Sequence, residues 1–384
     1  MGECEPLFPK ELLSASDEAR IKYFSEKKLA HPNLRTAFDR VVSALAPGNP
    51  HSLLLVTGPT GVGKTTLCHG VVKHFQTLNS PPDPGRIPVA MMEATAPPSG
   101  NYDWKEHFIR SLEAMGEPLI DNKTHFGGLF ENPKRSYRLS RKNPSTMDLR
   151  TALESCLRNR NPRVFMIDEA QHMRKVASGR RLIDQMDTIK SIANRSSVKH
   201  LLTGAYDLLD LSDLIGQLNR RTVEIHLPRY RYEIEEEPKA FRTVLANLES
   251  NLPVPNQGTF DPHLGYVYQM SAGCVGILKD WLTEGLVLTL SEKATEVSMA
   301  HLESTAISDR QLDRIVREIR EGERSFGGSR QDGIRANLGI GPVAIEKAAP
   351  SKPASGPRRL PGKRKPKRDP IGLQNPEAPE GLVS

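Results

Sequence analysis

The sequence has no apolar run that approaches the roughly 20 residues of a membrane-spanning helix, which argues against a membrane protein. Its N-terminus carries acidic residues and lacks the basic and then apolar pattern of a signal peptide. The four cysteines, Cys4, Cys68, Cys156 and Cys274, lie far apart and form no CxxC pair. This spacing fits neither a zinc site nor a disulfide framework. We therefore expect a cytoplasmic protein with reduced thiols.

Positive charge is concentrated towards the C-terminal end of the chain. The 384 residues carry a formal net charge of +7, and residues 322–384 hold twelve Lys and Arg against six Asp and Glu. Since that segment accounts for +6, residues 1–321 are left with +1. The segment is also rich in Gly and Pro and lacks apolar periodicity, so we expect it to be disordered. Nucleic-acid binding by the nearly neutral remainder would have to rest on local basic patches.

A glycine-rich phosphate-binding motif stands near the N-terminus. The apolar run 52–57 predicts a strand, residues 65–75 predict a helix, and the pattern GxxxxGK[ST] fills the turn between them. Glycines let backbone N–H groups face the β- and γ-phosphates, Lys64 supplies a positive charge, and Thr65 offers a hydroxyl to Mg²⁺. The residues that we assign to the nucleotide are Gly58, Pro59, Thr60, Gly61, Val62, Gly63, Lys64, Thr65 and Thr66.

A second motif places two carboxylates at the end of an apolar strand. Residues 164–167 predict a buried strand, and Asp168 and Glu169 follow it at the edge where ligands bind in open α/β sheets. We expect Asp168 to hold Mg²⁺, directly or through water, and Glu169 to be the general base for the attacking water. ATP is favoured over GTP because residues 122–125, the nearest match to Asn-Lys-x-Asp, lack the aspartate. The Asp-Glu-Ala-Gln string also resembles a DExx-box helicase, but no second strand–helix series follows residue 227.

Alternating apolar runs and helical patterns predict an α/β fold of the P-loop NTPase type, with a parallel sheet flanked by helices. Further strands are expected at 87–93, 198–203 and 223–227, whereas residues 235–321 show only helical patterns. We therefore divide the chain into four parts. These are an N-terminal helical segment (1–50), an α/β nucleotide-binding domain (51–232), a small helical lid domain (233–321) and a basic, Pro-rich tail (322–384).

The ordered set of motifs resembles the TnsC/TniB-type AAA+ regulators of DNA transposition. The resemblance covers roughly residues 35–320, and its least common strings are 93–99 (Glu-Ala-Thr-Ala-Pro-Pro-Ser), 108–118 and 167–172 (Ile-Asp-Glu-Ala-Gln-His). The strings at 202–205 and 218–221 complete it. It implies the AAA+ form of the fold, with ATP and Mg²⁺ as cofactors. The basic segment 121–146 and the tail fit no pattern of this family.

The resemblance assigns further residues to the site. Thr203 would orient the attacking water, although a hydroxyl there could equally cap the following turn. Arg220 or Arg221, with Arg221 slightly preferred, would reach the γ-phosphate of a neighbouring subunit as an arginine finger, although paired arginines are usually a solvated face. Lys279 would be the lid's sensor residue, although a surface lysine explains it equally well.

The resemblance also implies partners. Such a protein would assemble on double-stranded DNA as a ring or helical filament, hexamer-like per turn. It would link a transposase to a target selector, either a DNA-binding protein or an RNA-guided complex, and hydrolysis would drive disassembly. Basic residues would contact DNA phosphates, and the candidates are Lys105, Lys123, Lys134, Arg135, Arg138, Arg141 and Lys142. These could equally form a solvated loop, and the basic cluster at 363–368 could bind DNA, tether a partner or only add solubility.

Two other functions remain open from the sequence. An origin-binding initiator or helicase loader would share the ATPase, but it would need a DNA-reading winged helix after the lid, which residues 322–384 do not supply. A signalling or scaffold NTPase of the secretion or STAND type would bind protein and not DNA. The nearly neutral charge of residues 1–321 is compatible with that function.

Overall fold

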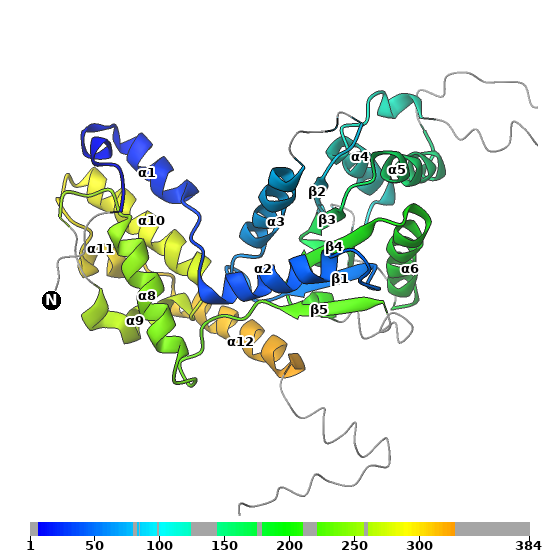
Figure 1. Cartoon of the computed structure of the whole chain (residues 1–384). Helices are drawn as coiled ribbons and strands as arrows, with labels where there is room; N and C mark the ends of the chain where they lie inside the picture. The colour runs from blue at the N-terminus through cyan, green and yellow to red at the C-terminus, as the bar shows by residue number, and fades with distance from the viewer. Residues whose placement is uncertain are drawn as a thin grey trace, which may run out of the picture. The chain divides into compact units, whose positions relative to one another are not determined.

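The computed structural model describes residues 7–79, 83, 85–97, 100–123, 144–174, 179–209, 221–256 and 260–326. Within these ranges the predicted parallel sheet is confirmed, with five strands in the order β2-β3-β4-β1-β5 (Figure 1). The strands are β1 (Leu53–Thr57), β2 (Val89–Glu93), β3 (Val164–Asp168), β4 (Lys199–Gly204) and β5 (Thr222–His226). All neighbouring strands run parallel. Their carboxyl ends therefore meet at one edge of the sheet.

Both faces of the sheet are buried. In β1, Leu53 and Leu55 belong to one hydrophobic cluster, whereas Leu54 and Val56 belong to another. The first cluster is closed by α4 (Trp104–Ala114), α5 (Thr146–Arg160) and α6 (Gly179–Ser196). The second is closed by α2 (Pro32–Leu45) and α3 (Lys64–Leu78). This two-sided burial explains why the strands are continuous apolar runs in the sequence and do not alternate with polar residues.

A helical part with its own core follows β5. It consists of α8 (Glu237–Ser250), α9 (Leu264–Ser271), α10 (Val275–Ser291), α11 (Met299–Ser304) and α12 (Asp309–Phe326). Phe241, Phe260 and Trp281 are among the large side chains buried there. Short 3-10 helices complete the described elements: η1 (Lys10–Ser14), η2 (Ile120–Asn122), η3 (Ala170–Arg174) and η4 (Asp261–His263). Within the described ranges, no helix is long and apolar enough to cross a membrane.

The N-terminal segment 1–50 joins both cores of the chain. Its helix α1 (Asp17–Glu26) packs Phe24 into the helical core, while α2 packs on the sheet. Arg20 of α1 also donates a hydrogen bond of 2.8 Å to the backbone oxygen of Pro253. At the other end, α12 continues past the expected limit of the lid at 321, and the compact unit ends at Phe326. Gly322 lets α12 continue against the ring of Tyr206, where any Cβ would collide.

Candidate nucleotide site

The glycine-rich loop joins the carboxyl end of β1 to the start of α3, as the sequence predicts (Figure 1). Gly61 and Gly63 have φ values of +74° and +103°, which L side chains rarely adopt. Gly63 is the N-cap of α3, and Lys64 is the first helical residue. The free N–H groups of the first helical turn and the positive end of the helix dipole therefore face the loop. Such a loop and helix start form a cradle for an anion.

Lys64 lies inside this cradle, with only 7% of its surface exposed. Its Nζ donates hydrogen bonds to the backbone oxygens of Gly58 at 3.0 Å and Pro59 at 2.9 Å. Burial lowers the pKa of Lys64, and the negative charges of Glu169 and Asp168 oppose that shift. The ammonium group is thus held by the backbone of the phosphate loop itself.

Asp168 is the centre of the hydrogen-bond network. It ends β3, is 3% exposed, and accepts a hydrogen bond of 2.7 Å at Oδ2 from the Thr65 hydroxyl. Its Oδ1 accepts from the Thr203 hydroxyl and, at 3.0 Å, from the backbone N–H of Glu169. Hydroxyl and carboxylate oxygens are hard ligands of the kind that Mg²⁺ takes in proteins. Thr65 and Asp168 therefore fit the predicted magnesium site.

Thr203 stands at the end of β4, beside Asp168, and is fully buried. Its hydroxyl donates to the Asp168 carboxylate and accepts a long contact of 3.6 Å from Cys68 Sγ. The pKa of Cys68 is raised to about 12, mainly by burial and also by the charge of Asp168, so this thiol stays protonated. The sequence left open whether the Thr203 hydroxyl caps a turn; in the structure it bonds to the neighbouring strand.

Glu169 leaves the strand in a left-handed backbone conformation, with φ of +51°. Such a conformation is uncommon for a residue with a side chain and concentrates at functional sites. Its carbonyl oxygen accepts from the backbone N–H of His172 at 3.0 Å, which closes the first turn of η3. The Gln171 side chain donates to the Glu169 carboxylate. The structure thus brings Lys64, Thr65, Asp168, Glu169 and Thr203 together at the carboxyl edge of the sheet.

A cavity of about 510 Å³ opens beside the loop. The sequence did not predict one of its walls. That wall is the N-terminal stretch 25–34, which no motif marks; the only signal was His31 and Pro32 ahead of an amphipathic helix. His31 Nδ1 lies 3.1 Å from the Tyr230 hydroxyl, and burial lowers the pKa of His31 to about 4. The cavity is lined by residues 25–29, His31, Leu34, Val62, Gly63, Thr66, Val275, Gly276 and Lys279.

The helical part closes the other side of the cavity. The backbone N–H of Gly276 donates to the Gly61 oxygen at 2.6 Å, and a Cβ at position 276 would stand 2.4 Å from that oxygen. The lid helix α10 can therefore approach the phosphate loop only with glycine at this position. Lys279 also faces the cavity, where its Nζ donates to the backbone oxygen of Ser25 at 2.6 Å. Its role as a phosphate sensor stays a prediction.

Arg221 lies at the edge of the sheet opposite the phosphate loop. Its backbone oxygen accepts from the N–H groups of Ser52 and Leu53, at 3.0 and 3.2 Å, just where β1 begins. The length of β1, roughly 16 Å at about 3.3 Å per residue, separates it from the loop. Arg221 therefore does not serve the phosphate site of its own chain, and its side chain is exposed. Arg220 lies outside the described residues.

Two of the candidate DNA contacts lie in the described part of the chain. Lys105 is half-buried in the first turn of α4. Lys123 forms an ion pair of 2.6 Å with Glu117 and is 23% exposed, so its charge is largely compensated. The remaining candidates lie outside the described residues, as does the cluster 363–368; they are Lys134, Arg135, Arg138, Arg141 and Lys142.

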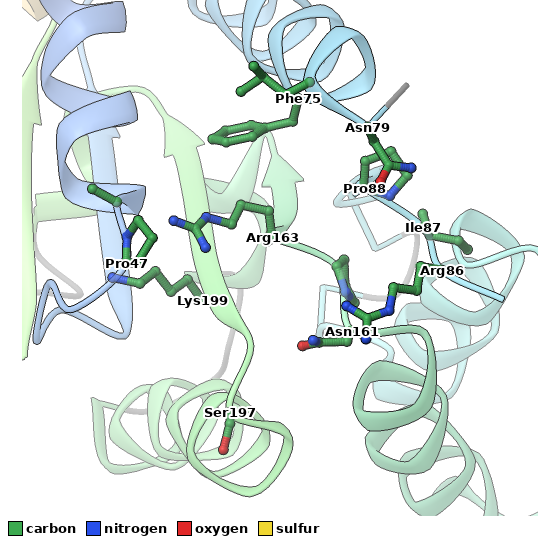
Figure 2. A pocket seen from close by; sticks show the side chains of 13 residues that line it. Pro47, Phe75, Asn79, Arg86, Ile87, Pro88, Asn161, Arg163, Ser197 and Lys199 are labelled. Carbon is green, nitrogen blue, oxygen red and sulfur yellow. The ribbon is translucent and has the colours of Figure 1, made fainter. Parts of the chain in front are cut away.

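A second cavity, of about 460 Å³, lies at the amino ends of β2, β3 and β4 (Figure 2). Arg86, Arg163 and Lys199 contribute positive charge to it, and Arg163 extends between Phe75 and Lys199. The Lys199 Nζ donates to the backbone oxygens of Ala44 at 2.9 Å and Asn49 at 2.8 Å. None of the residues assigned to the nucleotide lines this cavity. This cavity is therefore separate from the candidate nucleotide site.

Residues 49–211 match the family model of the AAA domain, a range that contains the cradle, Asp168, Glu169 and Thr203. No curated protein matches the sequence. The Aeropyrum pernix ORC2 protein in its ADPNP-ADP complexes is similar at 15% identity, over 76% of this chain and 74% of that chain, with a TM-score of 0.47. Drosophila ORC bound to DNA is similar at 12% identity, over 85% and 80%, with a TM-score of 0.48.

The Thermotoga maritima RuvB Holliday junction branch migration motor is similar at 15% identity, over 83% of this chain and 86% of that chain, with a TM-score of 0.37. The matched family model, the parallel sheet and the helical part after it together give the P-loop AAA+ fold.

Proposed function

We propose that this chain is an ATPase that binds ATP with Mg²⁺ in the cradle and hydrolyses it to ADP and phosphate. The observation that carries the proposal is the convergence of Lys64, Thr65 and Asp168 with Glu169 and Thr203 at one edge of the sheet. These residues come from α3, β3 and β4, so only the folded chain assembles them. The cavity between residues 25–34 and α10 has the size and place to take the adenosine part of the nucleotide.

Each side chain has a chemical task in this proposal. The backbone N–H groups of the loop and the Lys64 ammonium bind the phosphates and offset the charge that develops as the γ-phosphate leaves. Glu169 accepts a proton from the attacking water. The Thr203 hydroxyl and the Thr65 hydroxyl both hold the Asp168 carboxylate in position. Mg²⁺, held by Thr65 and Asp168, would neutralise phosphate charge when it is bound.

Nucleotide binding tests the cradle. The Lys64→Ala variant loses charge-assisted hydrogen bonds worth about 1.5–3 kcal/mol each, so its ATP affinity should fall on the order of 100-fold or more. Lys73→Ala is the matched control, because Lys73 lies on the exposed face of the same helix α3. Equilibrium binding of a fluorescent ATP analogue measures both. Equal affinity of Lys64→Ala and the wild type would refute the cradle.

We also infer that the active site is completed by a second copy of the chain. The support is the place of Arg221, which is exposed and lies across the sheet from its own cradle. In a ring or filament, this edge of one copy can meet the nucleotide of the next. An arginine supplied in trans stabilises transition-state charge and is worth about 10³–10⁵ in rate in GTPases. ATP would then favour assembly, and hydrolysis would favour disassembly.

We further propose that the assembly forms on double-stranded DNA and regulates transposition, by joining a target selector to a transposase. This finer proposal rests on the resemblance of strings such as 93–99 and 167–172 to the TnsC/TniB-type regulators. Phosphate contacts with DNA make binding depend on salt, because each contact releases counterions. The test is binding to a labelled duplex with ATP, at about 50 and 200 mM salt. Absence of binding at low salt would exclude this proposal and favour a protein-binding scaffold NTPase.

A further inference from the structure

The side chain of Gln171 bridges the ends of two neighbouring strands. Its Nε2 donates a hydrogen bond of 2.5 Å to Glu169 Oε2, just after β3. Its Oε1 accepts, at 3.2 Å, from the backbone N–H of Ala205, just after β4. A single amide therefore ties the Glu169 carboxylate to the end of the strand that carries Thr203.

The Gln171 amide approaches β4 closely at Gly204. A Cβ at Gly204 would stand 2.4 Å from Gln171 Oε1 and 3.3 Å from the Gln171 backbone nitrogen. A side chain at 204 would therefore require the Gln171 side chain to move, and it would crowd the backbone of η3. The backbone of η3, the glycine at 204 and the Gln171 amide form one matched arrangement.

The segments on both sides of the bridge are held by further contacts. Arg174 of η3 and Asp207, three residues beyond the end of β4, form an ion pair of 3.0 Å. The hydroxyl of Tyr206 lies 2.9 Å from Nε2 of His226 in β5. The segment after β4 is thus a fixed point, against which Gln171 can hold a neighbouring side chain.

We propose that Gln171 is a positioning residue that orients the Glu169 carboxylate for hydrolysis, an inference that rests on Glu169 being the general base. The amide holds Oε2 and leaves Oε1 to face the attacking water. Glu169 directly follows Asp168, whose carboxylate accepts from the Thr65 hydroxyl of the cradle and from the Glu169 N–H, so the Glu169 side chain begins beside the cradle. Since the Glu169 backbone has left the strand in a left-handed turn, the strand alone does not fix this side chain.

The first measurement separates kcat from nucleotide affinity. Misplacing a catalytic group by about 1 Å can cost 10²-fold, so Gln171→Ala should lower kcat for ATP about 10- to 100-fold. The affinity for ATP should stay within about twofold, because the hydrogen bonds of the Gln171 side chain run to Glu169 and Ala205 and not to the phosphate loop. The control Gln76→Ala removes the same side chain from an exposed position on α3 and should change neither quantity. A wild-type kcat for Gln171→Ala would overturn the proposal.

The second measurement is a double-mutant comparison in single-turnover hydrolysis. If Gln171 acts through Glu169, the variant with both Glu169→Gln and Gln171→Ala should be no slower than Glu169→Gln alone. A further loss in the double variant would show an independent or merely structural role, and would overturn the proposal. If Glu169→Gln itself hydrolyses ATP at the wild-type rate, the assignment of the general base fails instead. The two failures are therefore distinguishable.

Discussion

Replacing Thr203 with valine tests the hydrogen-bond network around Asp168 without changing the volume of the side chain. The hydroxyl of Thr203 is fully buried and donates to a carboxylate that is itself 3% exposed. A hydrogen bond to a charged group is worth about 1.5–3 kcal/mol, and the Thr65 hydroxyl and the Glu169 N–H remain as donors to the Asp168 carboxylate in the variant. We therefore expect the free energy of unfolding to fall by about 2 kcal/mol in the absence of nucleotide.

Urea denaturation followed by circular dichroism measures this loss. The Thr203→Ser variant is the matched control, because it keeps the hydroxyl and loses only one methyl group, worth about 0.8 kcal/mol. With saturating ATP and Mg²⁺, the metal would also balance the Asp168 charge, so the deficit of Thr203→Val should shrink. If Thr203→Val is as stable as the wild type, or less affected than Thr203→Ser, then Thr203 does not support Asp168 and the reasoning is refuted.

Two further predictions concern the subunit interface and acid stability. Arg221→Ala should lower ATPase activity while keeping ATP binding, and mixing this variant with Lys64→Ala should restore part of the activity. The control Arg310→Ala, on the exposed face of α12, should be unaffected. A mixture that recovers no activity would argue against an arginine finger supplied in trans. His31 has a pKa of about 4 in the folded chain, below its unfolded value of about 6.5, so the unfolded chain binds the extra proton between these values. The contribution of neutral His31 to the free energy of unfolding should therefore be fully present above about pH 6.5 and should fall towards pH 4. His31→Asn should flatten this dependence of stability on pH in thermal unfolding. An unchanged dependence would contradict a buried, neutral His31.

The sequence predicted the positions of candidate-site residues wherever those positions depend on short, local patterns. The strand–loop–helix order around residues 58–65 fixes the cradle through glycine conformation and the start of a helix. The run before Asp168 fixes the place of that carboxylate, because a buried strand in a parallel sheet must end at the ligand-binding edge. All five strands were placed within about two residues, since strands buried on both faces are continuous apolar runs.

The parts that the sequence did not predict depend on contacts between distant segments. Nothing local to residues 25–34 shows that they form a wall of the cavity beside Gly63, because that contact exists only once α1 packs on the helical core. Gln171 belongs to a string that the sequence analysis named, but its hydrogen-bond partner Ala205 follows another strand, β4. The sequence therefore does not show that the two residues meet. The sequence did not predict that α12 continues past Gly322, because a glycine commonly marks the end of a helix. In the structure, Gly322 instead leaves room for the Tyr206 ring.

Phosphate release from ATP, with bound nucleotide measured in the same samples, tests the central claim most directly. The full chain would be compared with Glu169→Gln in the presence of Mg²⁺ and duplex DNA. We predict that both proteins bind ATP and that Glu169→Gln releases phosphate at least about 100-fold more slowly, since a general base contributes about 10²–10⁴ in rate. Equal rates of release, or a wild-type chain that binds no ATP, would contradict the account of an ATPase site at the edge of β3.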